Sequence, residues 1–435
     1  MFNSIINNVT KLIKFINNTT ILPIKTKQIR IHMQISPQYS KIVMHIYLLT
    51  FHLIFQSFTT IFLIFFTIFV IHNTKNYSLN LQSITMKRLR IIMIGILASF
   101  MLIPASAQQI SYSVEKIWGN GTTHCAFSSL IHFNGRYYCS FREGASHIFD
   151  KDGKAEGKVR IIASVDGEKW ESVAYVGKED VDLRDPKLSV TPDGKILVTI
   201  GGSIYRNRNL EACIPHYMLS EDGKTFSAPE PAEIDPKMTT KRDWIWRVTW
   251  HGGVGYAVSY NKAPEGDSNG NELWLLKTAD GKKFEAITKL QIDGYPNEST
   301  VRFLPDGRMA IMVRREAGDT RGWWGVSEAP FTKWEWKKMG LRLGGQDFLV
   351  LDDNRIVMCT RNYAVPGAAK TCVYMGNNNG FFEEVLCLPS GGDNSYPGII
   401  TVGDELWISY YSGHEGPNPS IYLAKIPMSN FRKQK

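Results

Sequence analysis

One feature limits the fold of this chain more than any other: a hairpin pattern that occurs six times at nearly regular spacing. Each copy is an apolar strand, a turn made of two residues drawn from Asn, Asp and Gly, and a second apolar strand. The turns are Asn134-Gly135, Asp193-Gly194, Gly252-Gly253, Asp306-Gly307, Asp353-Asn354 and Gly403-Asp404, with spacings of 59, 59, 54, 47 and 50 residues. Short strands repeated with a period of about 50 residues are typical of the blades of a β-propeller.

A second, shorter signature follows three of the hairpins. It combines Ser or Thr, Asp-Gly and an aromatic residue, in the segments 164–170, 220–226 and 278–284, and 327–334 is a degraded copy. The Asp and hydroxyl side chains can bond nearby backbone, while the aromatic residue plugs the core behind the turn. Helical periodicity is nearly absent, and a β-sandwich does not explain so regular a repeat. We therefore predict an all-β, six-bladed propeller over residues 108–435, in which strand 110–117 completes the last blade beside strand 420–426.

Two apolar segments precede the predicted propeller. Residues 47–71 form an uncharged run long enough to span a bilayer. Residues 86–107 combine a basic start at Met86, a short apolar stretch and an Ala-x-Ala site, the three parts of a secretory signal peptide. We predict that 86–107 directs export, to the periplasm or the medium, and that 1–85 is a non-structural upstream extension. The alternative is a membrane anchor through 47–71.

Charge and cysteine content exclude several classes of protein. Residues 1–107 carry 10 basic and no acidic residues, so 108–435 has 40 basic and 41 acidic residues of the totals of 50 and 41. This balance excludes a basic nucleic-acid-binding body. The six cysteines show no CxxC pair and no metal-ligand spacing, and several lie inside apolar runs, where we interpret them as small buried residues. We predict no metal, no cofactor, no membrane contact for the mature domain, and a monomer.

The register of the hairpins predicts which side chains meet at one end of the propeller axis. Because side chains alternate along a strand, residues at the same offset from each turn share one orientation. Eight residues after a turn stand Arg142, Arg314 and Arg361, and eight before stand Asp185, Glu298 and Tyr396. His124, His147, Arg184, Arg247, Asp347 and His414 lie close to the same rim. A cationic rim with embedded carboxylates suits an anionic ligand, here an acidic sugar of a glycan, with Trp118, Trp244, Trp246, Trp323 and Trp324 as candidate stacking surfaces.

With these residues in place, segment 110–430 resembles the sialidase superfamily, six-bladed propellers with Asp-box (BNR) repeats of the form Ser-x-Asp-x-Gly-x-Thr-Trp. The copies here lack one residue before the glycine. The resemblance implies an exo-glycosidase whose nucleophile is a tyrosine paired with a glutamate. Tyr396, in Asn394-Ser-Tyr-Pro-Gly, is similar to that tyrosine, and Glu298, in Asn297-Glu-Ser-Thr-Val, to that glutamate. Arg314 is similar to one arginine of the family's carboxylate-binding triad, and Asp150 or Asp152 to its acid/base aspartate.

The chain departs from the family at the other two triad positions. The family's Arg-Ile-Pro is replaced by the stretch 124–128, which has no arginine, and Arg361 lies near the third position but not on it. Arg142 is expected to restore the missing charge from a neighbouring strand. The substrate is therefore expected to be an acidic oligosaccharide or glycoconjugate that ends in sialic acid or a uronate. Two alternatives remain: a uronate-directed glycosidase or lyase that uses His124 and His147 as acid or base, and a non-catalytic glycan-binding propeller.

Overall fold

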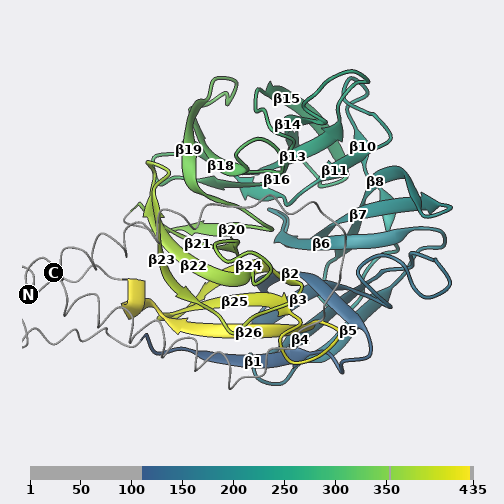
Figure 1. Ribbon diagram of the computed structural model, residues 1–435, viewed down its shortest axis with the longest axis vertical. Coiled ribbons are helices and arrows are strands. Elements are labelled where there is room, and N and C mark those ends of the chain that lie inside the picture. The colour runs from purple at the N-terminus through teal and green to yellow at the C-terminus, as the bar shows by residue number, and fades with distance from the viewer. Residues whose placement is uncertain (1–109, 352–353, 432–435) are drawn as a thin grey trace, which may run out of the picture. The chain divides into compact units, whose positions relative to one another are not determined.

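The computed structural model describes residues 110–351 and 354–431, which fold into 26 strands and one short 3₁₀ helix. The strands form six sheets that follow one another in chain order, apart from β1, which joins the last sheet (Figure 1). Strand pairing is antiparallel within the sheets except where β10 pairs in parallel with β15. The predicted signal peptide 86–107 and the apolar run 47–71 lie outside the described residues. Among the described residues, no helix has the length and apolarity needed to cross a membrane.

The sheets are the six blades. The first blade holds β2 (His124–Phe133), β3 (Arg136–Gly144), β4 (Lys158–Ser164) and β5 (Glu171–Val176), and the second holds β6 (Asp182–Val190), β7 (Ile196–Arg206), β8 (Asn209–Ser220) and β9 (Glu230–Pro231). The third holds β10 (Glu233–Ile234), β11 (Asp243–Ile245), β12 (Thr249–His251), β13 (Val254–Lys262), β14 (Asn271–Thr278) and β15 (Lys283–Leu290). The fourth holds β16 (Pro296–Phe303), β17 (Met309–Arg315), β18 (Arg321–Ser327) and β19 (Glu335–Arg342), and the fifth holds β20 (Asp347–Val350), β21 (Arg355–Asn362), β22 (Lys370–Asn377) and β23 (Phe382–Cys387). The sixth holds β24 (Asn394–Val402), β25 (Glu405–Ser412), β26 (Ser420–Pro427) and β1 (Ser113–Trp118), and the helix Met428–Phe431 follows it.

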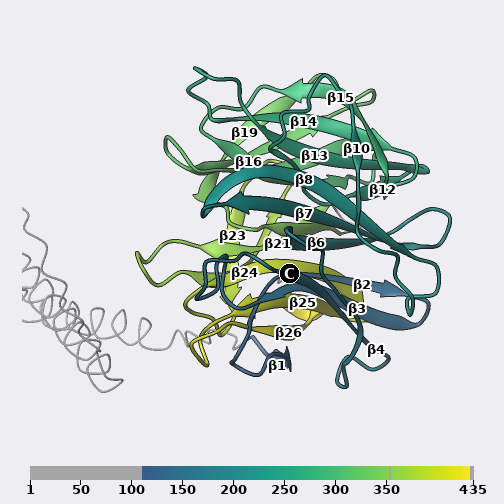
Figure 2. The ribbon, with the colours of Figure 1, turned by 90° about the vertical axis from the view of Figure 1, so that its right-hand side faces the viewer.

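The inner strands of the blades surround a common axis, as Figures 1 and 2 show from two directions. β2 contacts β6 on one side and β24 on the other, so the first and last blades meet and the ring closes. β1 pairs antiparallel with β26, from Ser113 opposite Lys425 to Trp118 opposite Ile421. The chain therefore closes the ring by completing its last blade with its first strand. This confirms the predicted six-bladed, all-β fold and the predicted place of the N-terminal strand.

The hairpin turns differ in form, whereas the sequence predicted one form for all of them. Asn134-Gly135 and Gly252-Gly253 are two-residue turns in which both residues have positive φ, at 45° and 74° and at 57° and 82°. In the Asp193-Gly194 turn only the glycine has positive φ, and the loop runs from Thr191 to Lys195. The preceding residue is a proline here and at Asp306-Gly307, and its fixed φ favours a type I turn followed by a left-handed glycine. The prediction of uniform two-residue turns was wrong for these two hairpins.

The shorter signature forms the same hydrogen bonds in all three copies. In the first, Asp166 Oδ1 accepts the amide protons of Glu168 and Lys169, and Ser164 Oγ accepts that of Gly167 at 2.8 Å. Equivalent bonds occur around Asp222 and Asp280. These bonds close each turn locally, as predicted.

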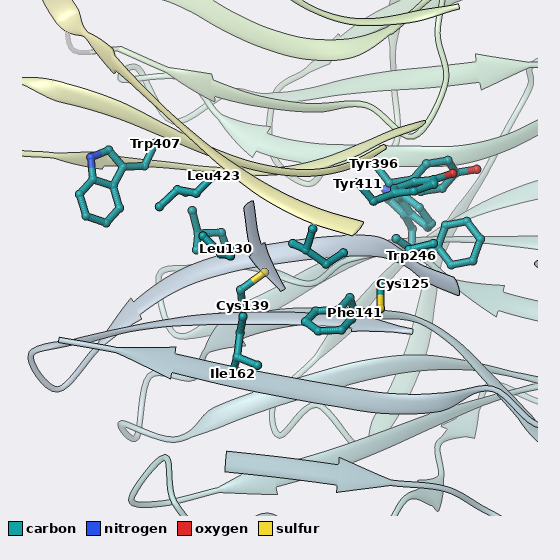
Figure 3. Packing of buried hydrophobic residues seen from close by; sticks show 14 of the residues in the cluster. Cys125, Leu130, Cys139, Phe141, Ile162, Trp246, Tyr396, Trp407, Tyr411 and Leu423 are labelled. Carbon is teal, nitrogen blue, oxygen red and sulfur yellow. The ribbon is translucent and has the colours of Figure 1, made fainter. Parts of the chain in front are cut away.

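Apolar clusters fill the space between neighbouring blades. In one of them, Figure 3 shows Tyr396, Tyr411 and Trp246 together at one end, well away from Trp407. Fully burying one such large apolar side chain contributes roughly 1.5–3 kcal/mol. The clusters thus hold rigid the strand ends that carry the polar residues described below.

One pair of cysteines forms a disulfide that was not predicted from the sequence. Cys372 and Cys387 stand opposite each other on β22 and β23 and form a disulfide. They are 15 residues apart in sequence, so only the strand register brings them together. The other four cysteines, at 125, 139, 213 and 359, are free and buried.

Candidate active site

Bulges in the inner strands aim the predicted site residues at the axis. The pairing of β2, β6, β16 and β24 with the next strand shifts register after residues 126, 184, 296 and 395. Phe127, Asp185 and Tyr396 lie in three of these bulges with positive φ of 67°, 47° and 51°. Positive φ costs energy for residues other than glycine, and bulges are frequent where a strand must redirect a side chain into a site. The common offset found in the sequence therefore corresponds to a common distortion of the blades.

Tyr396, Glu298 and Arg314 form a closed hydrogen-bonded group. The Tyr396 hydroxyl donates to Glu298 Oε1 at 2.5 Å. Arg314 Nη1 donates to Glu298 Oε2 at 2.7 Å and to Tyr396 Oη at 2.9 Å, and the Gly345 amide donates to Glu298 Oε2 at 3.0 Å. Glu298 and Tyr396 are 6% and 9% exposed. These three side chains come from two blades, since Glu298 and Arg314 lie on β16 and β17 of the fourth blade and Tyr396 lies on β24 of the sixth.

The protonation states in this group are set by burial and by Arg314. Burial raises the pKa of Tyr396 well above 10, and the charge of Glu298 adds to the rise despite Arg314 and Arg361. Burial alone would raise the pKa of Glu298 too, but the charge of Arg314 and the hydrogen bonds hold it below its ordinary value. Arg314 and Arg361 act to lower the pKa of Tyr396, but burial outweighs them. The resting pair is a neutral phenol bonded to a carboxylate that can receive its proton.

A cavity of about 520 Å³ opens beside this pair. Its walls include His147, Arg184, Asp185, Glu298 and Tyr396 from the predicted set. Of the five tryptophans considered for stacking, Trp244 lines it. Tyr205, Tyr260 and Tyr295 also line it, and none of the three was selected from the sequence. Trp246 and Trp324 are buried in the core. Tyr295 is 44% exposed, and its ring can offer an apolar face to a ligand.

Asp393 joins the histidines to the rest of the site. Its Oδ2 lies 2.7 Å from His147 Nδ1 and 3.3 Å from His124 Nε2, while its Oδ1 accepts the Tyr411 hydroxyl at 2.7 Å. Burial would raise the pKa of Asp393, but hydrogen bonds from the two histidines and Tyr411 hold it well below its usual range. Arg361 Nη2 lies 3.4 Å from Oδ1. Sequence reasoning missed Asp393, and its position three residues before Tyr396 was the available signal.

Several predicted ligand-binding residues are held in ion pairs between blades. Arg142 is 1% exposed and donates from Nε to Asp182 Oδ1 at 2.8 Å, so it does not supply the missing triad charge to an open site. Arg184 also bonds Asp182, at 3.3 Å, but reaches the cavity wall. Arg247 donates to Asp347 Oδ2 at 2.6 Å and to the Pro397 carbonyl at 3.1 Å, which anchors the strand next to Tyr396.

The carboxylates near the first blade have separate surroundings. Asp150 accepts amide protons of Asp152 and Lys154 within its own loop, and Asp152 lines a different hollow beside Arg206 and Arg208. Neither is among the residues that line the Tyr396 cavity. Asp185 does line it, and burial raises the pKa of Asp185 to about 6, against the opposing charge of Lys187 3.9 Å away. Lys187 is buried and donates to the carbonyls of Phe127 and Ser128, and it too was missed.

One side-chain cluster has the composition of a metal site. Ligand atoms of His124, His147 and Asp393 lie within 4.8 Å of one another, a set that zinc or iron can use. Both facing imidazole nitrogens are already directed at one carboxylate oxygen, and Arg361 stands beside the other oxygen. These hydrogen bonds account for the cluster without an ion. A second cluster, of Cys372, Glu384 and Cys387, contains the disulfide.

Comparison with known proteins adds the fold and little more. No protein-family model and no curated protein sequence matches the chain. Among solved structures, a protein of unknown function from Dyadobacter fermentans is similar over 72% of this chain and 99% of its own, at 19% identity and a TM-score of 0.60. Trypanosoma rangeli sialidase is similar over 72% of this chain and 59% of its own, at 13% identity and a TM-score of 0.58. An α-L-arabinanase from Penicillium chrysogenum is similar over 73% of this chain and 99% of its own, at 12% identity and a TM-score of 0.56.

Proposed function

We propose that this protein is an exo-acting glycoside hydrolase of sialidase type that removes a terminal acidic sugar from glycans. One observation carries the proposal: the Tyr396 hydroxyl donates to Glu298 Oε1 at 2.5 Å, with Arg314 bonded to both residues. Tyrosine nucleophiles paired with a glutamate are a known exception to two-carboxylate glycoside hydrolysis. The sialidase and the arabinanase of similar fold support a glycan as the substrate.

The proposed reaction has two displacements. Tyr396 Oη attacks the anomeric carbon while its proton passes to Glu298, and the bond to the leaving oxygen breaks. The leaving oxygen takes a proton from a separate acid group. Water then attacks the same carbon and gives a proton back to that group, while Tyr396 leaves and regains its own proton from Glu298. Because the pKa of Tyr396 is raised, the phenol reacts with transfer of its proton rather than as a free phenolate. Two inversions leave the sugar with its original anomeric configuration.

The charges around the tyrosine support an anionic sugar. Arg314 and Arg361 have partly exposed side chains, 12% and 17%, next to Tyr396. A neutral phenol can approach an anionic sugar without charge repulsion, and a guanidinium can hold its carboxylate. β2 supplies no arginine, and the Phe127 ring from this strand packs 5.0 Å from the Tyr396 ring. A uronate is therefore an alternative to sialic acid, because the carboxylate site differs from the family's triad.

Export remains part of the proposal, with cleavage after Ala107. The Cys372–Cys387 disulfide supports it, since disulfides persist mainly in oxidising compartments. We propose that the exported protein acts as a monomer on oligosaccharides or glycoconjugates and needs no cofactor.

A panel of 4-nitrophenyl glycosides tests the proposal. The panel contains an α-sialoside, α- and β-glucuronides, and neutral hexosides and arabinosides, and the products are followed by proton NMR. We expect turnover of one acidic glycoside with retention of configuration. An unsaturated uronate product would instead indicate a lyase. Binding of acidic glycans without turnover would indicate a non-catalytic propeller.

A further inference from the structure

The proposed reaction needs a group that gives a proton to the leaving oxygen and later takes one from water. The family resemblance assigned this role to Asp150 or Asp152. Both carboxylates lie away from the cavity walls, and Asp150 is engaged by amides of its own loop. The proton donor must therefore come from the residues that line the cavity with Tyr396.

His147 has the geometry of such a donor. It lies in the loop between β3 and β4, lines the cavity, and has a side chain that is 50% exposed. Its Nδ1 lies 2.7 Å from Asp393 Oδ2, so the carboxylate accepts the Nδ1 proton and fixes the tautomer and the orientation of the ring. Nε2 is then the nitrogen that remains for exchange with a ligand. The His147 and Phe127 rings form a T-shaped pair with centroids 5.3 Å apart, and Phe127 in turn contacts Tyr396.

Asp393 is itself held from several sides. Tyr411 donates to its Oδ1, and buried His124 approaches its Oδ2 at 3.3 Å. Asp393 also directly precedes β24, the strand that carries Tyr396. The nucleophile and the carboxylate that orients His147 are thus fixed by the same short segment, three residues apart.

We propose that His147, oriented by Asp393, is the acid/base residue of this site. This inference rests on the proposed glycosidase function. In the first step the imidazolium Nε2–H gives its proton to the leaving oxygen as the glycosidic bond breaks and the bond to Tyr396 forms. In the second step neutral Nε2 takes a proton from the attacking water as the bond to Tyr396 breaks. Asp393 stays ionised throughout and is a positioning residue.

Leaving-group dependence tests this role. For the acidic sugar that the wild-type enzyme cleaves, kcat/KM is measured on the 2,4-dinitrophenyl glycoside, whose leaving group needs no proton, and on the methyl glycoside, whose leaving group does. For His147→Ala we expect a loss of about 10²–10⁴-fold on the methyl glycoside and less than about tenfold on the dinitrophenyl glycoside. In His147→Ala the second step should limit kcat on the dinitrophenyl glycoside, because water is no longer deprotonated. Azide, which needs no base, should restore this kcat and yield a glycosyl azide of retained configuration. Asp393→Asn should also lose more kcat/KM on the methyl glycoside than on the dinitrophenyl glycoside, but both losses should be smaller than in His147→Ala.

His132→Ala is the matched control, since His132 is an exposed histidine on β2 outside the cavity, and it should behave as wild type on both substrates. Equal losses on the two substrates in His147→Ala would overturn the proposal, as would the leaving-group pattern appearing in Asp185→Asn instead. Activity lost on dialysis against EDTA and restored by zinc would also overturn it, because the cluster would then bind an ion. A wild-type protein that hydrolyses no glycoside of the panel refutes the proposed function and this role together.

Discussion

Replacing Glu298 by glutamine separates proton transfer from simple charge in the Tyr396 group. Glutamine keeps the shape of the side chain and can still accept the Tyr396 hydrogen bond, but it cannot take the proton. The variant also removes the negative partner of Arg314 Nη1, which lies 2.7 Å away. Glu316 offers a matched control, since it pairs with the same arginine through Nε and is not among the hydrogen-bond partners of Tyr396.

The role assigned to Glu298 sets the size of the expected effect. Proton transfer by a positioned group contributes about 10²–10⁴-fold, which is about 3–5 kcal/mol at 1.36 kcal/mol per tenfold. Glu298→Gln should lower kcat by this factor and change KM by less than about threefold. Glu316→Gln should lower kcat by less than about tenfold, because Arg314 still forms its ion pair with Glu298. Loss of one hydrogen-bonded carboxylate should destabilise the Glu298 variant by about 1–3 kcal/mol.

Steady-state kinetics and thermal unfolding on both variants measure these effects. Because the pKa of Glu298 is lowered and its carboxylate is the active form, wild-type kcat/KM, which reports the first step, should persist as pH falls to 4.5 and decline only below it. Equal kcat values for the two variants, or a Glu298→Gln enzyme within tenfold of wild type, would refute proton transfer to Glu298.

Three further predictions concern the surroundings of the pair and the start of the mature chain. Arg361→Ala should weaken the binding of an acidic sugar by about 2–5 kcal/mol, measured by calorimetry, and leave the affinity for its uncharged amide unchanged. Equal losses of affinity for acid and amide would mean that the arginine has a structural role. Gly345→Ala should lower kcat, because its Cβ would lie 2.4 Å from the Tyr396 ring, whereas Gly403→Ala, with a similar φ of 55° and open space, should lose only stability. N-terminal sequencing of the protein from its native host should begin at Gln108; a start before Met86 would favour the membrane anchor.

The fold was predictable because its signal is local and repeated. Each hairpin turn is specified by adjacent residues, and the regular spacing adds the information that six such units follow one another. The form of two turns was not foreseen, because Pro192 and Pro305 change the turn type while the Asp-Gly pair stays the same. The Cys372–Cys387 disulfide depends on the pairing of β22 with β23, which residue spacing does not reveal.

The site was predictable only where the strand period decides it. Glu298, Arg314 and Tyr396 share an offset from their turns, and the bulges turn this offset into contact. Arg142 has the same offset, but its side chain donates to Asp182 of the next blade. The strand period predicts how far along the axis a residue lies, and it does not predict which residue its side chain will contact. Asp393 and His147 lie just outside regular strands, so the strand period could not predict that their side chains meet.

A covalent bond between Tyr396 and the sugar is the central claim, and trapping it is the most direct test. The enzyme is incubated with a fluorinated glycosyl fluoride of the acidic sugar that it cleaves, then digested and analysed by tandem mass spectrometry. The account predicts one added glycosyl group per chain, on the Tyr396 hydroxyl, and none in Tyr396→Phe, which keeps the ring and deletes only the hydroxyl. A label on another residue, or a Tyr396→Phe enzyme with wild-type turnover, would contradict it.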